Sequence, residues 1–325
     1  MPLDPAVAAV RSAVRRDLAG ATRPVVVACS GGADSLALLA GTVFEAGKVA
    51  VPVVGVTVDH GLQEGSAEQA AHVVEQMATL GADETMTVRV HVEARGRGPE
   101  AAAREARYAV LEEVAERTGA APVLLGHTLD DQAETVLLGL ARGSGGRSIA
   151  GMRRAFPPFS RPLLVLTRAQ TEQACRAQGI TWWDDPHNDD PRFARSRVRR
   201  RVLPVLEEEL GPGVALALAR TADGLRENVA ALDAWAAAVH QAACHDDGLD
   251  TGPLDGLPDA VLHRVVRLEV LARGALDADL TRGHVLAVAR LARETRTDRE
   301  IQLPGHLTAR REGPLLRLRP TAVRG

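Results

Sequence analysis

Residues 25–40 read VVVACSGGADSLALLA, in which a strand-like segment is joined to a helix-like segment by a glycine turn. A β-type run of valines stops at Ser30, Gly31 and Gly32, and a helix-type apolar pattern begins directly after Asp34. A pair of glycines between a strand and a helix allows a sharp turn whose N–H groups point inward, and the helix adds the positive end of its dipole. The stretch therefore indicates a phosphate site, although the lysine of the common phosphate loop is missing.

The side chains of this turn suggest how phosphate can be held without a lysine. The hydroxyl groups of Ser30 and Ser35 add donors to the main-chain amides. Asp34 would repel bare phosphate, so its presence predicts an intervening Mg²⁺. A plain helix cap with a turn glycine is the alternative interpretation. The predicted phosphate-binding set consists of Ser30, Gly31, Gly32, Ala33, Asp34 and Ser35.

The composition indicates a soluble globular protein. The 325 residues are 46% hydrophobic and 25% charged, which suits one large or two ordinary domains. A formal net charge of −3 leaves room for one local basic patch. No signal peptide and no run near the ~20 apolar residues of a membrane span are present, so we expect a cytoplasmic location and no membrane partner. Cys29, Cys175 and Cys244 form no CxxC pair, which argues against a disulfide framework and a zinc or iron–sulfur site.

Strand-like and helix-like segments alternate through the first half of the chain. The predicted strands are 25–30, 51–61, 85–93 and 121–127. The helices that follow them are 34–47, 66–80, 99–118 and 129–141. This alternation predicts an α/β fold with a parallel sheet and helices on both faces. Ligands of such sheets bind beyond the carboxyl ends of the strands, where Asp59, His60, Gly126 and His127 are expected.

The second half of the chain has a different pattern. Residues 162–179 suggest a strand and a helix, and 182–204 a polar loop that becomes basic. A long helix is predicted over 214–243, then helical segments near 258–273 and 281–293 and a hairpin over 301–319. We therefore predict a smaller, mostly helical C-terminal domain with a terminal β-hairpin. The predicted divisions are a catalytic domain (1–210), a connecting helix (211–245) and a C-terminal module (246–325).

The segment GHTLDDQAET (126–135) gathers acidic side chains. On a helix, Asp130, Asp131 and Glu134 share one face with His127, and neighbours on such a face lie ~5–6 Å apart. Carboxylates stacked in this way would repel one another, which predicts a cationic partner. The candidates are an amine and a metal such as Mn²⁺ or Zn²⁺, and a solvated acidic face is the plain alternative.

Two arginine-rich segments are candidates for anion binding. In PEAAAREARY (99–108), Arg104 is expected to pair with Glu100, whereas Arg107 is the candidate for a contact with a phosphate or with a substrate carboxylate. Residues 192–201 carry six arginines and no acid, which predicts a surface that follows a phosphate backbone. A chance run in an arginine-rich protein is the alternative.

Here the chain resembles a known family. SGGADS matches the SGGxDS signature of the PP-loop ATP pyrophosphatases, which adenylate a substrate with ATP. VDHGL, PEAAAREARY, GHTLDDQAET, RGSG and the segment 182–204 resemble, in order, the successive motifs of the tRNA(Ile)-lysidine synthetases. The resemblance spans roughly residues 23–205. It implies a Rossmann-like PP-loop fold, ATP and Mg²⁺ as cofactors, and a tRNA-modifying ligase. Its substrates would be free L-lysine and the isoleucine tRNA with a CAU anticodon.

The resemblance also implies roles for single residues. Asp59, His60, Gly126 and His127 would line the nucleotide pocket with residues 30–35. Asp131 and Glu134 would recognise lysine. Ser196 stands where the family pattern RNxxR has asparagine, whereas Arg195 and Arg199 keep their places. We expect catalytic roles for Asp34, Arg107, Asp131, Glu134 and Arg199. We expect substrate contacts from Arg104, Arg107, Asp130, Asp131, Glu134, Arg142, Arg195 and Arg199, and a homodimer is one expected assembly.

Two alternatives stay open at this point. Another PP-loop adenylating enzyme, such as a tRNA thiolase or an amide-forming synthetase, would use the same loop. A nonenzymatic tRNA-binding protein with a relict loop would bind tRNA without forming AMP. Thiolases rely on reactive cysteines or CxxC clusters, whereas Cys29 falls inside the first predicted strand and is expected in the core.

Overall fold

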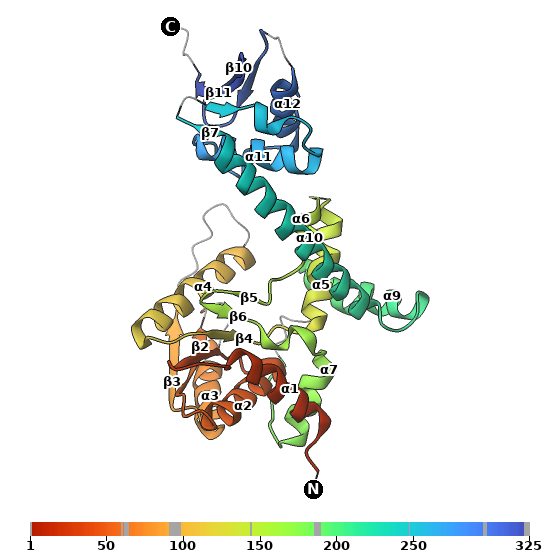
Figure 1. The fold of residues 1–325 in the computed structure, drawn as a ribbon. Helices are drawn as coiled ribbons and strands as arrows, with labels where there is room; N and C mark the ends of the chain where they lie inside the picture. The colour runs from red at the N-terminus through yellow and green to blue at the C-terminus, as the bar shows by residue number, and fades with distance from the viewer. Residues whose placement is uncertain are drawn as a thin grey trace. The chain divides into compact units, whose positions relative to one another are not determined.

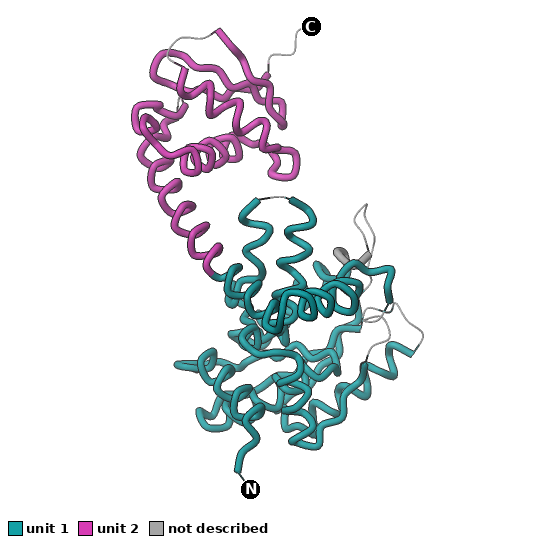
Figure 2. Tube along the Cα trace, turned by 90° about the vertical axis from the view of Figure 1, so that its right-hand side faces the viewer, with its two compact units in different colours: residues 1–223 teal, residues 224–325 magenta. Residues whose placement is uncertain are grey.

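The computed structural model describes residues 2–59, 61, 65–90, 99–143, 145–184, 190–246, 248–294 and 298–321, without the side chains of 99–102. The chain divides into two compact units, Met1–Asp223 (unit 1) and Gly224–Gly325 (unit 2) (Figure 2). The long helix α10 (Val214–Ala243) begins in unit 1 and ends in unit 2.

Unit 1 is built on a six-stranded sheet with the order β3-β2-β1-β4-β6-β5 (Figure 1). Its strands are β1 (Val25–Ala28), β2 (Val53–Asp59), β3 (Glu84–Arg89), β4 (Val123–Leu125), β5 (Ala155–Phe156) and β6 (Phe159–Ser160). All neighbours from β3 to β6 are parallel, and only the edge strand β5 is antiparallel. The predicted parallel sheet is confirmed.

Helices cover both faces of this sheet because alternate valines of β1 point to opposite sides. Val25 and Val27 pack in one apolar cluster with α1 (Pro5–Asp17), α2 (Ala33–Gly47), α3 (Ser66–Thr79) and α7 (Arg168–Ala177). Val26 packs in another cluster, with Leu111 and Val114 of α4 (Pro99–Thr118). The near-continuous valine runs follow from burial on both faces.

The chain changes direction across the sheet between β1 and β4. From β1 it proceeds to β2 and β3 on one side, and then β4 pairs with the free edge of β1. The loops that follow β1 and β4 therefore leave the sheet side by side. This switch point is where open parallel sheets bind ligands.

The remaining elements of unit 1 surround this switch point. They are α5 (Leu129–Arg142), α6 (Gly146–Ile149), a 3₁₀ helix (Pro162–Val165), α8 (Ala194–Arg197), a π-helical turn (Val198–Val202) and α9 (Leu203–Glu209). The strand predicted at the start of 162–179 was wrong. Pro162 has no N–H to give to a sheet ladder, so β6 ends at Ser160 and the apolar run turns into the 3₁₀ helix.

Unit 2 packs two helices against a five-stranded antiparallel sheet with the order β7-β8-β11-β10-β9. Its elements are β7 (Cys244–His245), β8 (Gly248–Asp250), a 3₁₀ turn (Gly252–Leu254), α11 (Asp259–Ala272), α12 (Arg282–Arg293), β9 (Glu300–Leu303), β10 (Leu307–Glu312) and β11 (Leu315–Pro320). The predicted hairpin is β10–β11, and the sheet extends it on both sides.

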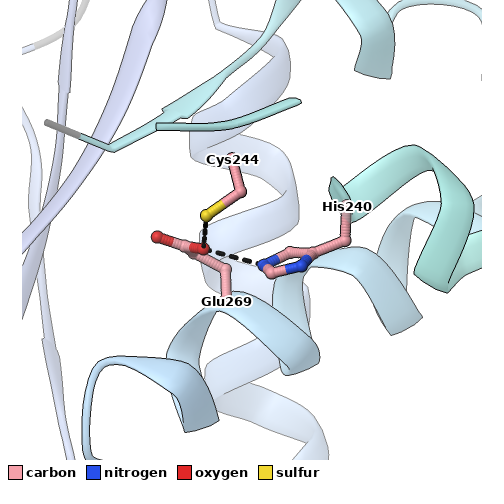
Figure 3. A group of neighbouring side chains, drawn as sticks. All are labelled: His240, Cys244 and Glu269. Atoms are coloured by element: carbon pink, nitrogen blue, oxygen red, sulfur yellow. Dashed lines mark hydrogen bonds and ion pairs between the residues drawn. The ribbon is translucent and has the colours of Figure 1, made fainter. Parts of the chain in front are cut away.

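A buried carboxylate lies inside unit 2 (Figure 3). Glu269 of α11 is 0% exposed. Its Oε2 lies 2.8 Å from Nε2 of His240 and accepts from Sγ of Cys244 at 3.6 Å, and its Oε1 accepts from Nε of Arg273 at 2.7 Å. Both carboxylate oxygens thus have partners within the chain, which accounts for this group without a metal. Among the described residues, no helix is long and apolar enough to cross a membrane.

Candidate active site

The phosphate loop (residues 30–35) forms the start of the site. Gly31 has φ +82°, and a Cβ at this position would lie 2.6 Å from Cγ2 of Val73, so a side chain is excluded on both grounds. α2 begins at Ala33, and its N-cap Gly32 offers no side-chain acceptor to the helix. The first turn of α2 therefore presents uncapped N–H groups, as an anion site requires.

Ser35 braces the loop from inside. Its Oγ accepts from the N–H of Ser30 at 3.1 Å and donates to the carbonyl of Gly32 at 2.9 Å. The N–H of Trp183 also donates to the carbonyl of Gly31, at 3.0 Å. The hydroxyl proton of Ser35 is thus donated to the carbonyl of Gly32. The sequence predicts instead that this hydroxyl donates to phosphate.

Gly126 brings the loop after β4 against the phosphate loop. A Cβ at this position would lie 3.1 Å from the backbone N of Ser35 and 3.2 Å from the carbonyl C of Asp34. The glycine therefore permits the close approach of two backbones at the switch point. It also places His127 directly beside the loop.

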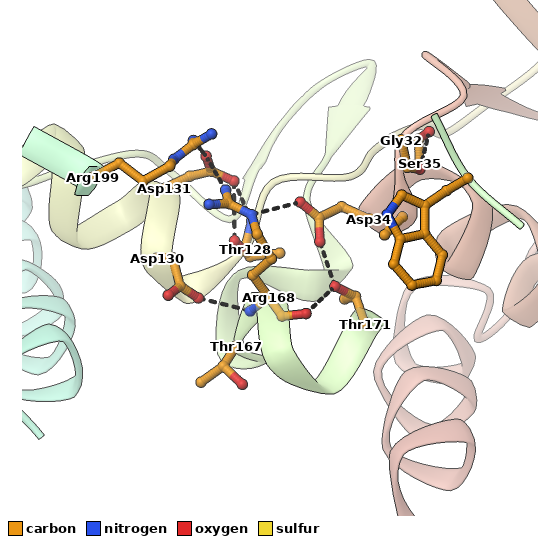
Figure 4. A network of polar contacts seen from close by, with 12 residues as sticks. Gly32, Asp34, Ser35, Thr128, Asp130, Asp131, Thr167, Arg168, Thr171 and Arg199 are labelled. Carbon is orange, nitrogen blue, oxygen red and sulfur yellow. Dashed lines mark hydrogen bonds and ion pairs between the residues drawn. The ribbon is translucent and has the colours of Figure 1, made fainter. Parts of the chain in front are cut away.

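Asp34 lies in the first turn of α2 and joins the loop to α7 (Figure 4). Its Oδ1 accepts a short hydrogen bond from Oγ1 of Thr171, and its Oδ2 accepts from Nε of Arg168 at 3.4 Å. Burial raises the pKa of Asp34 to about 6, against the opposing effect of Arg168 and Thr171. The contacts with Arg168 and Thr171 therefore do not fully offset the cost of burying the charged carboxylate.

Arg168, the first residue of α7, links the phosphate loop to the acidic helix α5 (Figure 4). Its Nη2 lies 3.2 Å from Oδ1 of Asp131, and its Nη1 lies 3.9 Å from Oε1 of Glu134. Its backbone N–H donates to Oδ2 of Asp130 at 2.7 Å. One guanidinium thus approaches three carboxylates, those of Asp34, Asp131 and Glu134.

Arg199, from the π-helical turn, completes the network from the opposite side. It holds Glu134 in a two-pronged ion pair, with Nε 2.6 Å from Oε1 and Nη2 3.1 Å from Oε2. Its Nη2 also donates to Oδ1 of Asp131 at 3.2 Å, and Nε of Arg195 lies 3.8 Å from Oε2 of Glu134. Burial raises the pKa of the fully buried Glu134 despite the pairing with Arg199.

Asp131 serves the network and caps its own helix. Its Oδ2 accepts from the N–H of Thr128 at 2.8 Å and from the Thr128 hydroxyl at 3.1 Å. Burial alone would raise the pKa of Asp131, but Arg168, the N–H of Thr128 and Arg199 hold it below its usual value. The capping bonds fix this carboxylate in one orientation.

The formal charges of the network do not cancel. Three carboxylates, of Asp34, Asp131 and Glu134, form ion pairs with three guanidinium groups, of Arg168, Arg195 and Arg199. A fourth carboxylate, that of Asp130, accepts only from the backbone N–H of Arg168. The cationic partner predicted from the sequence is therefore supplied in part by arginines of the chain itself. With Asp130 included, the formal count of these groups is one negative charge in excess.

A second cluster, of arginines around Tyr108, lies next to His127. The Tyr108 hydroxyl accepts from Nη2 of Arg104 at 3.2 Å and from Nη2 of Arg161 at 2.9 Å. The side chain of Arg107 makes no hydrogen bond or ion pair within the described part of the chain. Burial and the neighbouring cations Arg104, Arg195 and Arg161 lower its pKa. A half-buried guanidinium with no partner among the described residues is suited to an anionic ligand.

The remaining predicted residues lie apart from these two clusters. Asp59 ends β2, where its carboxylate accepts from the N–H of Gly61 at 2.9 Å and lies 3.7 Å from Nε of Arg89. Arg142 is exposed at the far end of α5, about 16 Å along the helix from Asp131. His60 and the side chain of Glu100 lie outside the described residues, so the expected Glu100–Arg104 pair stays a prediction.

Sequence reasoning missed three residues of the site: Arg161, Arg168 and Thr171. Arg161 stands within the apolar run FSRPLLVL, and an arginine in a buried run indicates a specific partner. Arg168 occupies the first turn of a helix, where the helix dipole disfavours a cation. Either feature of the sequence could have identified its arginine as a candidate site residue.

The cysteines of unit 1 do not form a reactive site. Burial raises the pKa of Cys29 and raises that of Cys175 to about 12. Both thiols are buried in the core of the sheet. Neither has the depressed pKa that a nucleophilic or cluster-binding thiolate needs.

Comparison with known proteins gives one consistent result. Residues 9–206 match the family model described as a PP-loop domain. The tRNA(Ile)-lysidine synthase of Thermobifida fusca is 51% identical over 310 residues, covering 94% of this chain and 95% of that protein. The synthase of Salinispora arenicola is 51% identical over 321 residues, covering 96% of each.

A solved structure shows the same fold at low sequence identity. It is the U34-tRNA thiolase NcsA from Methanococcus maripaludis with its [4Fe-4S] cluster, at a TM-score of 0.58 and 18% identity. The match covers 68% of this chain and 79% of that one. At this identity the likeness concerns the fold alone.

Proposed function

This chain belongs to the tRNA(Ile)-lysidine synthase family of PP-loop proteins, and from that premise we propose that it joins free L-lysine to C2 of a wobble cytidine. The tRNA is the isoleucine tRNA with a CAU anticodon, and ATP is consumed to AMP and pyrophosphate. The product base, lysidine, changes codon reading from AUG to AUA. The observation that carries the proposal is the uncapped phosphate loop joined through Asp34 and Arg168 to the carboxylates of α5.

The first step is adenylation of the cytidine. We assign the triphosphate of ATP to the amides of residues 31–35, at the N-terminus of α2. The C2 oxygen of the cytidine attacks the α-phosphate, and pyrophosphate leaves. Fixed N–H dipoles and nearby guanidinium groups stabilise the charge that develops on the phosphate, and stabilisation of this kind usually contributes most to lowering the barrier.

Mg²⁺ would bind at Asp34. The carboxylate supplies the hard oxygen ligands that Mg²⁺ prefers. Burial raises its pKa to about 6, and the surrounding network carries one surplus negative charge, so an added cation is favoured there. When bound, the ion would neutralise phosphate charge, while Asp34 and the loop amides hold the nucleotide in place.

The second step is attack by the ε-amine of lysine on C2, which expels AMP. We assign the side chain of lysine to Asp131 and Glu134. Both carboxylates are already paired with Arg168 and Arg199, so the amine shares their oxygens rather than finding them free. A new cation in the network weakens the hold of Arg168 on Asp34 and couples the lysine site to the nucleotide site.

The arginine cluster would bind the anionic parts of the substrates. Arg107, whose side chain has no partner among the described residues, lies beside Arg104 and suits the α-carboxylate of lysine or a phosphate. Arg195 and the other arginines of 192–201 suit the RNA backbone near the modified base. We assign the grip on the rest of the tRNA to the C-terminal module of residues 246–325.

The direct test is mass analysis of CAU-anticodon isoleucine tRNA after incubation with the protein, ATP, Mg²⁺ and lysine. We expect a lysine adduct on one cytidine, with AMP and pyrophosphate released in equal amounts. Parallel reactions contain sulfide or ammonia in place of lysine. A thiolated or aminated product with no lysine adduct would contradict the proposal, as would tRNA binding without AMP.

A further inference from the structure

Arg161 is held immobile by four contacts. It is 4% exposed and lies just after β6. Its Nε donates to Nδ1 of His127 at 3.3 Å, its Nη1 to the carbonyl of Arg153 at 2.6 Å, and its Nη2 to the Tyr108 hydroxyl at 2.9 Å. Its guanidinium also lies over the ring of Phe156, 4.3 Å from the centroid. The direction of each donor is therefore fixed.

The contact with His127 determines where the imidazole carries its proton. A guanidinium has only donors, so Nδ1 of His127 must accept and cannot carry a proton. We propose that Arg161 is a positioning residue that holds His127 as the neutral Nε2–H tautomer, and that this N–H donates to an anionic oxygen of the substrates. The identity of that oxygen, ATP phosphate or lysine carboxylate, rests on the proposed function.

The position of His127 leaves its Nε2 available. The residue follows Gly126, whose backbone packs against Asp34 and Ser35 of the phosphate loop. Within the described part of the chain, Nε2 has no hydrogen-bond partner. Neutral imidazole donors next to a helix N-terminus are a known way to polarise a reacting oxygen.

The charges around His127 favour the neutral ring. Arg104 and Arg107 of α4 and Arg161 face it with positive charge, and Asp131 of α5 faces it with negative charge. Burial and the arginines lower the pKa of His127 to about 3, against the effect of Asp131. The ring is thus uncharged throughout the neutral range and does not act as a general acid or base there.

The tautomer can be measured without any assay of activity. The chain has ten histidines, so ¹⁵N-histidine labelling gives ten ring correlations, and comparison with His127→Gln identifies that of His127. We expect a protonated Nε2 and a bare Nδ1 from pH 5 to 8. A proton on Nδ1, or titration near the ordinary histidine pKa, would overturn the inference even if lysidine synthesis is fully established.

Ligand titrations separate the two candidate oxygens. A non-hydrolysable ATP analogue with Mg²⁺ is added in one arm and lysine in the other. A downfield shift of the His127 Nε2 proton in one arm alone assigns the acceptor to phosphate or to carboxylate. An unchanged proton in both arms, with binding shown by calorimetry, would remove the donor role.

Two matched pairs of variants complete the test. Gln presents an amide N near the place of Nε2, whereas Asn presents it near Nδ1, so we expect His127→Asn to lose about 100-fold in kcat/KM and His127→Gln about 10-fold. Arg161→Met should mix the tautomers and add an acid limb to the pH profile beyond the one expected from Asp34. Arg104→Met removes a similar charge without touching Nδ1 and should leave the tautomer intact. Equal tautomer populations in both arginine variants would refute the role of Arg161.

Discussion

Two fully buried glutamates, Glu134 in unit 1 and Glu269 in unit 2, illustrate two uses of a buried charge. Glu269 stands alone among donors, with Arg273, His240 and Cys244 around its two oxygens. Glu134 shares Arg168 and Arg199 with two other carboxylates, those of Asp34 and Asp131. The first arrangement is complete. The second, with Arg195 and the nearby Asp130 counted, has one more carboxylate than guanidinium groups, and we propose that it accepts another cation.

This difference has an energetic meaning. A buried charge whose partners are all present is costly to disturb but has nothing left to bind. A cluster of like charges with too few counter-ions stores repulsion that a ligand can relieve, and such clusters gather at functional sites. The substitutions in unit 1 and in unit 2 should therefore differ in their effects on activity and on stability.

The largest effect is expected at Asp34. Asp34→Asn should lower kcat/KM for lysidine formation by about 10³-fold, because the metal and the phosphate loop lose their charged link. The same change should stabilise the fold by about 1–3 kcal/mol at pH 8. The pKa of Asp34 is raised, so its favourable contribution is complete below its unfolded-state pKa of 3.8 and is lost as pH rises through about 6.

Activity and thermal or urea unfolding, measured on the same preparation, check this prediction. Glu269→Gln is the control, since it removes a buried charge that lacks surplus repulsion. An Asp34→Asn protein that is inactive and also less stable at pH 8 would mean that Asp34 is an ordinary structural ion pair.

The next effect is expected from removing a shared arginine. Arg168→Met leaves Asp34 and Asp131 without their common counter-ion and should destabilise the protein by about 3–5 kcal/mol. Turnover should fall by about 100-fold where the protein is still folded, since the nucleotide and lysine sites lose their link. Added Mg²⁺ with an ATP analogue should restore part of the stability, because a new cation replaces the lost one.

Arg273→Met is the matched variant in unit 2, because Arg273 and Arg168 are similarly exposed, at 26% and 24%. It should lose stability without any rescue by nucleotide and Mg²⁺. Differential scanning calorimetry with and without the ligand measures both. Equal rescue of the two variants would erase the proposed distinction between the clusters.

The fold and part of the site could be predicted from the sequence because they depend on local patterns. Valine runs, glycine turns and caps determined β1, α2 and α5 closely. Arg168 and Arg161 could not be assigned in this way, because the carboxylates and the imidazole that they contact in the site lie 34 or more residues away in sequence. The sequence pattern indicates that the acidic residues of α5 need a cationic partner. Only the three-dimensional structure shows that Arg168 and Arg199 provide it.

The strands of unit 2 were also only partly predictable from the sequence. The β10–β11 hairpin was readable from its turn, but β7, β8 and β9 have only two to four residues each. Strands this short carry too few alternations to be recognised alone. Their pairing is decided by the apolar faces of α11 and α12 that they cover.

A smaller effect is expected in the pH dependence. With Asp34 at a pKa of about 6, kcat/KM should fall about tenfold per pH unit below pH 6 and be level above it. The Mg²⁺ proposed at Asp34 would compete with the proton for the same carboxylate, so raising Mg²⁺ should move this limb to lower pH. Initial rates at several Mg²⁺ concentrations measure the shift. A limb that ignores Mg²⁺ would have to come from another group.

The smallest effect is expected at Glu269, and it bears on the meaning of the whole comparison. Glu269→Gln keeps the shape of the side chain but loses the ion pair with Arg273, so we expect about 1–3 kcal/mol of lost stability. Turnover per folded molecule should stay within about twofold of wild type, because the proposed mechanism uses the carboxylates of unit 1 and not the buried pair of unit 2. Equilibrium unfolding and active-site titration separate the two quantities. Equal loss of turnover in Glu269→Gln and Glu134→Gln would mean that any buried carboxylate matters for activity. The proposed functional difference between the two clusters would then be refuted.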